Sequence, residues 1–503
     1  MIPVLVALVG GVVSALAFPR FGPGLLIVPG IGLVAWALRQ VTSRLQGFWV
    51  GWLYGFVFFM GVMWWSIELG LIALIPLALV QGLWFGGMGW LVAGWRETPP
   101  PQWVLIFSST WALTEFARYH FPFSGLEWGG AGYAVAPYSF AREAASVIGT
   151  SGWTVLLVGL AAALGFFASP AQRSLSYWAI GLVLVAGFAG ALDRPNPIVN
   201  REDLVRVAIV QGSTPCPFEK CAPDERLRTF ELHLASTKML PSGDLDLVVW
   251  AEGSTGSVNA DPVQNPEIGA AIGAEAARIG AWFLVGSDRP ISSFEWINAN
   301  VVFDDSGRIV GEYRKQQGVP FGEYIPFRPL FDWIPDLEQV PRDMVPGEGP
   351  VVFDTPDFDL GSVISFEGSF SRFARRHVRA GADLIVVATN EGSYGFTAVS
   401  DQLISMTRMR AAELGVPVVH AAVTGKSVII DQNGDFASDL SRLGNQELVL
   451  GNVVPGFPTF YARVGDWVMY MAILGGLYLV WRDRKVLVSN PKMSKGETDV
   501  GSA

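Results

Sequence analysis

Charged residues are scarce in the first 200 positions of this 503-residue chain, which hold only 14 of its 80 Asp, Glu, Lys and Arg residues. The first lysine is Lys220. With 51% apolar residues, 19 tryptophans and a mean hydropathy of +0.37, the composition is unusual for a soluble protein. The sequence therefore predicts a membrane section followed by a polar domain. The net charge of −10 belongs to the polar domain and argues against nucleic-acid binding.

Histidine and cysteine are also scarce, which limits metal chemistry. The four histidines are scattered, so we expect no metal cluster and no cofactor; they are His120, His233, His377 and His420. The two cysteines, Cys216 and Cys221, lie close together at the start of the polar domain. They form a disulfide if this domain faces an oxidising compartment and stay free otherwise. Without a nearby histidine they do not complete a zinc site.

Apolar runs predict eight membrane spans, although the shorter runs approach the minimum for a hydrocarbon core of roughly 30 Å. The first run resembles a signal peptide, because Ala15-Leu16-Ala17 is similar to a cleavage site. No basic residue precedes it and further spans follow at once, which favours a first transmembrane helix. The predicted spans are Val4–Phe18, Leu25–Leu38, Phe48–Ile67, Leu71–Ala93, Trp103–Phe116, Ser151–Ala168, Tyr177–Ala191 and Trp467–Trp481.

Basic residues near the ends of these spans predict their orientation. With the N-terminus inside, the inside loops and tail hold Arg39, Arg44, Arg96, Arg173, Arg482, Arg484 and Lys485. The outside loops hold Arg20, Arg118, Arg142 and Arg194. This modest bias places both termini inside and the polar domain outside.

From about Leu204 to Pro455, short apolar runs alternate with helical patterns, which predicts a layered α/β domain. The expected strands are Val205–Val210, Leu245–Trp250, Trp282–Val285, Asn300–Phe303, Leu384–Thr389, Val418–Ala422 and Val428–Ile430. The expected helices include Arg226–Met239, Pro266–Ile279, Phe370–Ala380 and Ser400–Leu414. We therefore divide the chain into seven spans (1–200), the polar domain (201–458), and an eighth span with a basic tail (459–503).

One stretch of the polar domain, Gln316 to Gly349, has little regular pattern. It contains Trp333, Ile334 and Met344 among prolines. Long irregular loops in compact domains are often functional, and an apolar one beside a membrane can contact lipid.

Three separated strand ends carry groups suited to catalysis. Glu252 ends the run Leu247-Val-Val-Trp-Ala-Glu, where a partly desolvated carboxylate serves as a general base. Lys315 follows a hairpin strand and can stabilise an oxyanion. Ser365 ends a third run, and strand alternation would put Glu367 on its face. Taken singly, each is more often a solvated strand end, so the case depends on their combination.

The chain resembles the apolipoprotein N-acyltransferases, which are membrane-embedded members of the nitrilase superfamily. Glu252, Lys315 and the position of Ser365, each in its flanking sequence, are similar to the Glu-Lys-Cys triad of that superfamily. The resemblance extends over nearly the whole chain. It also includes four strings: Phe123-Ser-Gly-Leu-Glu-Trp128 through Tyr133; Val319-Pro-Phe-Gly-Glu323-Tyr-Ile-Pro-Phe; Thr389-Asn390-Glu391; and Met406-Thr-Arg-Met-Arg410-Ala-Ala-Glu413.

The resemblance implies a nitrilase-like α-β-β-α sandwich inserted between spans seven and eight of an eight-helix bundle in a bacterial inner membrane. It implies transfer of an acyl chain from a phospholipid to the nucleophile, and then to the α-amino group of a lipoprotein's diacylglyceryl-cysteine. Glu252 would be the general base and Lys315 the oxyanion stabiliser. Glu323 and Glu367 would be supporting acids, and arms around the site would admit lipid from the membrane.

Departures from the family pattern leave two functions open. Ile-Cys-Tyr-Glu reads Ile364-Ser365-Phe366-Glu367 here, Trp250-Ala-Glu252-Gly replaces Trp-Pro-Glu-Ser, and Ser393 stands where an aromatic residue is usual. The chain is then either an acyltransferase that uses Ser365, or a catalytically impaired paralogue that binds lipid, lipoprotein or a partner enzyme. The eight predicted spans disfavour a soluble hydrolase or amidase of the nitrilase type.

Overall fold

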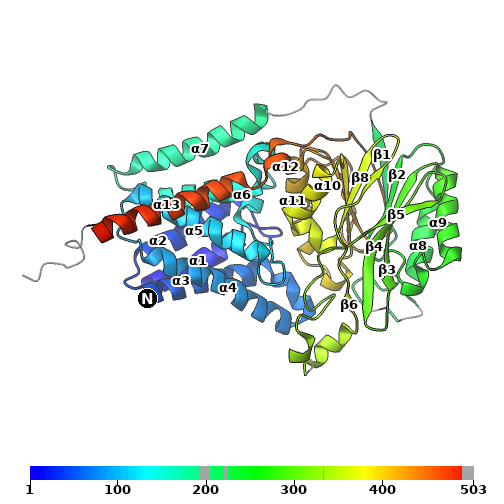
Figure 1. Cartoon of the computed structure of the whole chain (residues 1–503), viewed down its shortest axis with the longest axis horizontal. Helices are drawn as coiled ribbons and strands as arrows, with labels where there is room; N and C mark the ends of the chain where they lie inside the picture. Colours follow the sequence, from blue (N-terminus) through cyan, green and yellow to red (C-terminus); the bar gives the residue numbers. More distant parts are fainter. Residues whose placement is uncertain (193–203, 220, 223–224, 332, 490–503) are drawn as a thin grey trace, which may run out of the picture.

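The chain forms a helical section and a layered α/β domain that lie side by side (Figure 1). The computed structural model describes residues 1–192, 204–219, 221–222, 225–331 and 333–489. Arg194, Lys220 and the last part of the basic tail, which entered the sequence analysis, lie outside these residues.

Helices occupy all eight regions that the sequence predicts as spans. They are α1 (Ile2–Ala15), α2 (Ile27–Arg39), α3 (Arg44–Val62), α4 (Leu71–Ala93), α5 (Pro100–His120), α6 (Ser139–Leu164), α7 (Arg173–Leu192) and α13 (Trp467–Ser489). By length and composition, α3, α4, α6 and α7 can cross a membrane, and α1, α2 and α13 contain shorter apolar stretches. That all eight cross stays a prediction.

Two glycine features shape this helical section. α3 and α4 approach closely, because a Cβ on Gly51 would lie 2.1 Å from the carbonyl oxygen of Phe85. α6 begins at Ser139, earlier than the predicted Ser151, and Gly149 kinks it with a φ of 70°. The predicted span thus matches the part of α6 that follows the kink.

The α/β domain contains two sheets. The first has the order β12-β1-β2-β3-β4-β5, with β6 paired to β4. Its strands are β1 (Val205–Gln211), β2 (Leu247–Trp250), β3 (Trp282–Pro290), β4 (Glu295–Phe303), β5 (Ile309–Arg314), β6 (Asp343–Met344) and β12 (Glu447–Val453). The second has the order β11-β10-β9-β8-β7. Its strands are β7 (Val352–Asp354), β8 (Asp359–Ile364), β9 (Leu384–Thr389), β10 (Val418–Ala422) and β11 (Val428–Ile430).

The two sheets pack face to face between helices, which confirms the predicted α-β-β-α sandwich. Ile209, Val249, Ile364 and Val386 belong to the core between the sheets. Helices α8 (Arg228–Thr237) and α9 (Pro266–Ile279) cover the outer face of the first sheet. Helices α10 (Ser371–Arg379) and α11 (Val399–Leu414) cover the second and face the helical section, with the short α12 (Phe460–Val464) nearby.

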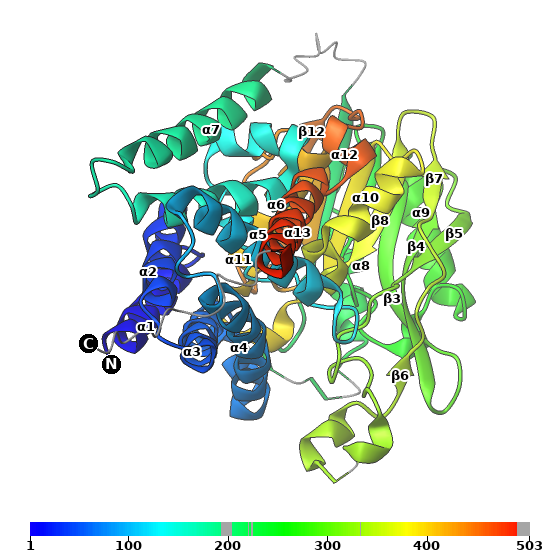
Figure 2. The same cartoon turned by 60° about the vertical axis from the view of Figure 1, so that its left-hand side comes forward.

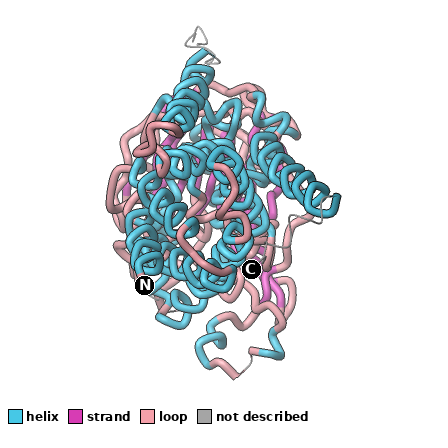
Figure 3. Tube along the Cα trace, turned by 90° about the vertical axis from the view of Figure 1, so that its left-hand side faces the viewer, coloured by secondary structure: helices cyan, strands magenta, loops and turns pink. Residues whose placement is uncertain are grey.

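The helical section and the sandwich are joined through buried polar side chains. Gln402 of α11 accepts hydrogen bonds from the indole nitrogens of Trp65 (3.1 Å) and Trp128 (2.6 Å). The Glu127 carboxylate accepts from the backbone N–H of Ser371, at the start of α10, at 2.7 Å. Viewed from the side of the helical section, the helices lie in front of the strands (Figure 3). The sandwich is therefore held directly against the helices.

The loop between Gln316 and Gly349 is irregular, as predicted. Among its described residues, this loop contains β6 and two short 3-10 turns, Arg328–Leu330 and Pro335–Gln339. Trp333 is 77% exposed, and Phe327 and Leu330 are also exposed, whereas Met344 is buried. The loop thus presents several large apolar side chains at the surface.

Candidate active site

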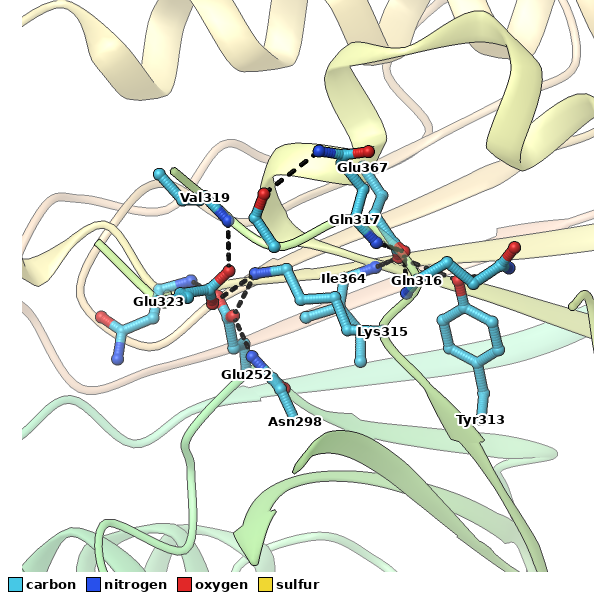
Figure 4. A network of polar contacts seen from close by, with 12 residues as sticks. Glu252, Asn298, Tyr313, Lys315, Gln316, Gln317, Val319, Glu323, Ile364 and Glu367 are labelled. Carbon is cyan, nitrogen blue, oxygen red and sulfur yellow. Dashed lines mark hydrogen bonds and ion pairs between the residues drawn. The ribbon is translucent and has the colours of Figure 1, made fainter. Parts of the chain in front are cut away.

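A buried lysine between two carboxylates forms the centre of the candidate site (Figure 4). Lys315, directly after β5, has a side chain that is 1% exposed. Its Nζ lies 2.6 Å from Glu323 Oε1 and 3.2 Å from Glu252 Oε1. Burial alone would lower the pKa of this ammonium, but the charges of Glu252 and Glu323 hold the pKa above its ordinary value. The two carboxylates therefore favour the charged form of Lys315.

Glu252 is fixed in place by groups from two other strands. The amide of Asn298 in β4 donates to Oε1 at 2.6 Å, and the backbone N–H of Asn390, after β9, donates to Oε2 at 2.9 Å. With Lys315, three hydrogen bonds occupy three of the four lone pairs of this carboxylate. Within the part of the chain that the structure describes, one lone pair on Oε2 is left to accept a proton.

Glu367 ties the lysine segment to the segment that holds Ser365. One carboxylate oxygen accepts from the backbone N–H groups of Gln316 and Gln317, directly after Lys315. The other accepts from the Tyr313 hydroxyl at 2.9 Å and the Ile364 N–H at 2.8 Å. Burial raises the pKa of Glu367 to about 7, although the backbone donors favour its charged form. A single buried carboxylate thus holds both segments.

Ser365 lies at a sharp turn of the chain and not within a strand. β8 ends at Ile364, and Ser365–Ser369 forms a 3-10 helix, so the predicted strand alternation between Ser365 and Glu367 is wrong. The reason is the left-handed backbone of Ser365, with a φ of 50°, which ends the extended run. Non-glycine residues in this region carry strain that is concentrated at functional sites. Ser365 is half-buried, and its side chain makes no hydrogen bond to the residues described.

Aromatic side chains border the site on the side of the helical section. The carbonyl oxygen of Phe123 accepts from the Gln317 side-chain amide at 3.2 Å, two residues beyond Lys315. The ring of Phe123 lies 6.1 Å from that of Phe321 and 6.3 Å from that of Phe327. This border brings the helical section and the exposed apolar loop to the lysine segment.

Two family models match this chain in succession. Residues 10–163 match the apolipoprotein N-acyltransferase N-terminal domain, and residues 206–454 match the carbon-nitrogen hydrolase family. The apolipoprotein N-acyltransferase of Geobacter metallireducens is 26% identical over 94% of this chain and 93% of its own length. That of Allorhizobium ampelinum is 27% identical over 87% of each chain. The chain belongs to the apolipoprotein N-acyltransferase family.

Among solved structures, an amidase from Nesterenkonia sp. aligns with 55% of this chain and 99% of its own, at 17% identity and a TM-score of 0.39. A carbon-nitrogen hydrolase from Helicobacter pylori aligns with 59% of this chain and 100% of its own, at 16% identity and a TM-score of 0.38.

The structure of this family member brings together four of the five predicted site residues by direct or bridging contacts. Glu252, Lys315 and Glu323 touch, and Glu367 joins their segment through Gln316 and Gln317. Ser365 stands one residue beyond Ile364, whose N–H that same carboxylate binds. The roles of all five residues stay predictions.

Three residues that support the site were not singled out from the sequence. Asn298 fixes Glu252, Tyr313 binds Glu367, and Asp288 lies opposite Asn298 in the β3–β4 pair. Burial, followed by the charges of Glu252 and Glu323, raises the pKa of Asp288 to about 7. One signal was present in the sequence: Asn298 and Asn300 place two amides on one face of an apolar strand, where polar groups need partners.

The disulfide between the two cysteines, which the sequence left open, is formed. Cys216 and Cys221 are bonded, with their Cα atoms 5.4 Å apart. The loop that they close places the ring of Phe218 4.5 Å from that of Phe396, just beyond the Thr389-Asn390-Glu391 string. The disulfide therefore supports a loop beside the candidate site.

Proposed function

We propose that this chain transfers an acyl chain from a phospholipid to the N-terminal diacylglyceryl-cysteine of a lipoprotein, with Ser365 as the residue that carries the acyl group. The observation that supports this most is the buried Glu252–Lys315–Glu323 cluster, whose lysine segment Glu367 ties to the strained turn at Ser365. Family membership over the length of the chain supports the choice of donor and acceptor.

In the first step, Glu252 takes the proton of the Ser365 hydroxyl as Oγ attacks the carbonyl carbon of a phospholipid ester. The Lys315 ammonium stabilises the oxyanion of the tetrahedral intermediate. When the ester C–O bond breaks, the lysophospholipid oxygen leaves with the proton from Glu252, and the acyl group stays on Ser365. The pKa of Lys315 is held high, so the lysine acts as a charge and not as a base.

In the second step, the α-amino group of the acceptor attacks the acyl-serine ester. Glu252 takes a proton from this amine, and Lys315 again stabilises the oxyanion. Ser365 Oγ then leaves with the proton, which restores the enzyme and forms the amide. Glu323 keeps the lysine ammonium in place, since its Oε1 lies 2.6 Å from Nζ.

The membrane setting supports lipid substrates. The apolar loop with Phe327, Leu330 and Trp333 lies next to the helical section, where it can guide an acyl chain toward Lys315. We place the protein in the bacterial inner membrane, with the sandwich on the extracytoplasmic side. The distribution of basic residues and the disulfide both favour this orientation.

The serine at the nucleophile position favours a second function, that of an impaired paralogue which binds lipid, lipoprotein or an enzyme partner. A thiol has a pKa near 8.5, whereas an alkanol hydroxyl hardly ionises at neutral pH. Losing the thiolate is expected to slow acylation by several orders of magnitude, at about 1.4 kcal/mol of barrier per tenfold. Glu252, acting as a general base on the Ser365 hydroxyl, would have to offset this loss.

The deciding experiment incubates the purified full chain with a fluorescent phospholipid and a diacylated lipopeptide. We expect labelled acyl-enzyme and N-acylated product from the parent, more of both from Ser365→Cys, and neither from Ser365→Ala. No product from the parent together with strong product from Ser365→Cys would favour the impaired paralogue. Activity of Ser365→Ala equal to that of the parent would show that Ser365 is not the nucleophile.

A further inference from the structure

Four arginines lie along α10. Arg372, Arg375, Arg376 and Arg379 stand at spacings of three, four and seven residues, which places them on neighbouring positions of one helix face. Together with His120 and Ser124 they line a cavity of about 390 Å³. We call this cavity the α10 basic pocket.

The α10 basic pocket lies where two membrane helices meet the sandwich. The Arg372 guanidinium donates to the carbonyl oxygens of Tyr119 (2.9 Å) and Ser124 (2.7 Å), at the end of α5. The Arg375 guanidinium donates to the carbonyl oxygens of Ala462 (2.9 Å) and Arg463 (3.2 Å), just before α13. α10, α12 and α13 lie next to one another at this boundary (Figure 2). The pocket is thus built by packing and is not a chance gathering of loose side chains.

The positive charge of the pocket is not neutralised by the protein. Among the described residues, no carboxylate forms an ion pair with any of the four arginines, and no acidic side chain lines the cavity. Glu127 and Glu367 act on the charge of Arg372, but both are buried and engaged with backbone N–H groups. Arg376 and Arg379 are exposed. Within the described residues, the four guanidinium groups are therefore left without a carboxylate partner.

Exposed aromatic side chains around the pocket mark the level of the lipid headgroups. Phe121 is 65% exposed and directly follows α5, and Phe460 of α12 and Tyr470 of α13 are also exposed. Aromatic residues at the ends of membrane helices favour the interface between water and hydrocarbon. Arginines on the water-exposed face of a soluble domain would not need exposed aromatic side chains around them.

We propose that the α10 basic pocket binds the phosphate of an anionic phospholipid from the leaflet next to the sandwich. Guanidinium groups match phosphate oxygens in geometry and charge, and the volume suits a headgroup. The aromatic surroundings place the pocket among lipids, which selects a lipid phosphate over a free one. The bound lipid would hold α10 on the membrane surface, and this binding does not depend on acyl transfer.

The test reconstitutes the full chain in nanodiscs of phosphatidylcholine with increasing phosphatidylglycerol and follows binding of a fluorescent phosphatidylglycerol by energy transfer from the protein's tryptophans. We expect saturable binding to the parent and about tenfold weaker binding to the Arg376→Gln/Arg379→Gln double variant. The matched control is Arg226→Gln/Arg228→Gln, which removes two exposed arginines at the start of α8, on the far side of the sandwich. This control should bind like the parent.

Three outcomes decide the proposal. Equal binding by the pocket variant and the parent, with equal melting temperatures in phosphatidylcholine, would overturn it. Displacement of the lipid by millimolar inorganic phosphate would also overturn it, since the pocket would then be a free-phosphate site. Normal binding by Ser365→Ala, together with loss in the pocket variant, supports the proposal whether or not the chain proves to be an acyltransferase.

Discussion

The buried Glu367 carboxylate gives the sharpest prediction, because its four hydrogen bonds join the two halves of the candidate site. Replacing Glu367 by Gln keeps one carbonyl oxygen, which can still accept from the N–H groups of Gln316 and Gln317. The new NH₂ group then faces Tyr313 and Ile364. The tyrosine hydroxyl can turn and accept from it, but the Ile364 N–H cannot.

The expected effect of Glu367→Gln is therefore concentrated at one backbone group. A buried donor without an acceptor costs about 1–3 kcal/mol. The Ile364 amide, next to Ser365, should then exchange its hydrogen about 5- to 150-fold faster than in the parent, at about 1.4 kcal/mol per tenfold. Gln316 and Gln317 should stay protected. Glu367→Ala, in contrast, leaves four buried donors unpaired, at about 4 kcal/mol or more, which is a large part of a typical domain's stability.

Hydrogen exchange measured by mass spectrometry on peptides covering residues 313–321 and 359–370 tests this distribution. The purified full chain is compared in nanodiscs at one pH. Glu348→Gln is the matched control, because Glu348 is exposed on the irregular loop. Unchanged exchange at Ile364 in Glu367→Gln, with a normal melting temperature, would refute the idea that this carboxylate holds the Ser365 turn.

Three further predictions concern the same region. Lys315→Met leaves Glu252 and Glu323 as buried carboxylates without their cation, so we expect the free energy of unfolding to fall by about 3–5 kcal/mol and no acyl-enzyme to form. The control variant Arg226→Gln should change neither the stability nor the acyl-enzyme yield. Because burial raises the pKa of Glu367 to about 7, its protonated form gains population as the pH falls below that value. The rate of acyl-enzyme formation by the parent should then fall between pH 7.5 and 6, and it should fall more than the rate of the Glu367→Gln variant. Equal pH dependence of the two rates would contradict this prediction. Reducing the Cys216–Cys221 disulfide opens a short loop, so the free energy of unfolding should fall by about 2 kcal/mol. Amide hydrogen exchange near Phe218 should become faster. The Cys216→Ser variant should show both effects without reductant.

The fold could be predicted from the sequence wherever local pattern and tertiary packing agree. The bounds of β9, β10, β11 and α9 match the expected ones, because continuous apolar runs or an Asn-Pro start define them locally. β3 extends to Pro290 and β4 starts at Glu295, beyond the expected strands. These extensions mix polar and apolar residues without a continuous apolar run, and they pair with each other as a hairpin.

The candidate site likewise has features that can be predicted from the sequence and features that cannot. Glu252, Lys315 and Ser365 stand where apolar runs end, which is visible in the sequence. That Glu367 turns back to bind Ile364, Gln316 and Gln317 is not visible, since it depends on the left-handed conformation of Ser365. The contribution of Asn298 depends on the register of β4 against β5, a long-range feature. Strand ends can be read locally, but the contacts between them cannot.

The Glu252–Lys315–Glu323 cluster itself bears on whether the protein is an enzyme. Burying these charges costs several kcal/mol for each ion, and well-packed apolar residues in their place are often neutral or stabilising. The cluster also occupies Asn298 and the backbone N–H of Asn390. A protein that only binds lipid has no need of a buried cation held beside a proton acceptor and tied through Glu367 to a strained serine turn. The cost of this arrangement is explained if it stabilises charge that develops on a substrate, which favours catalysis by Ser365 over a purely binding role.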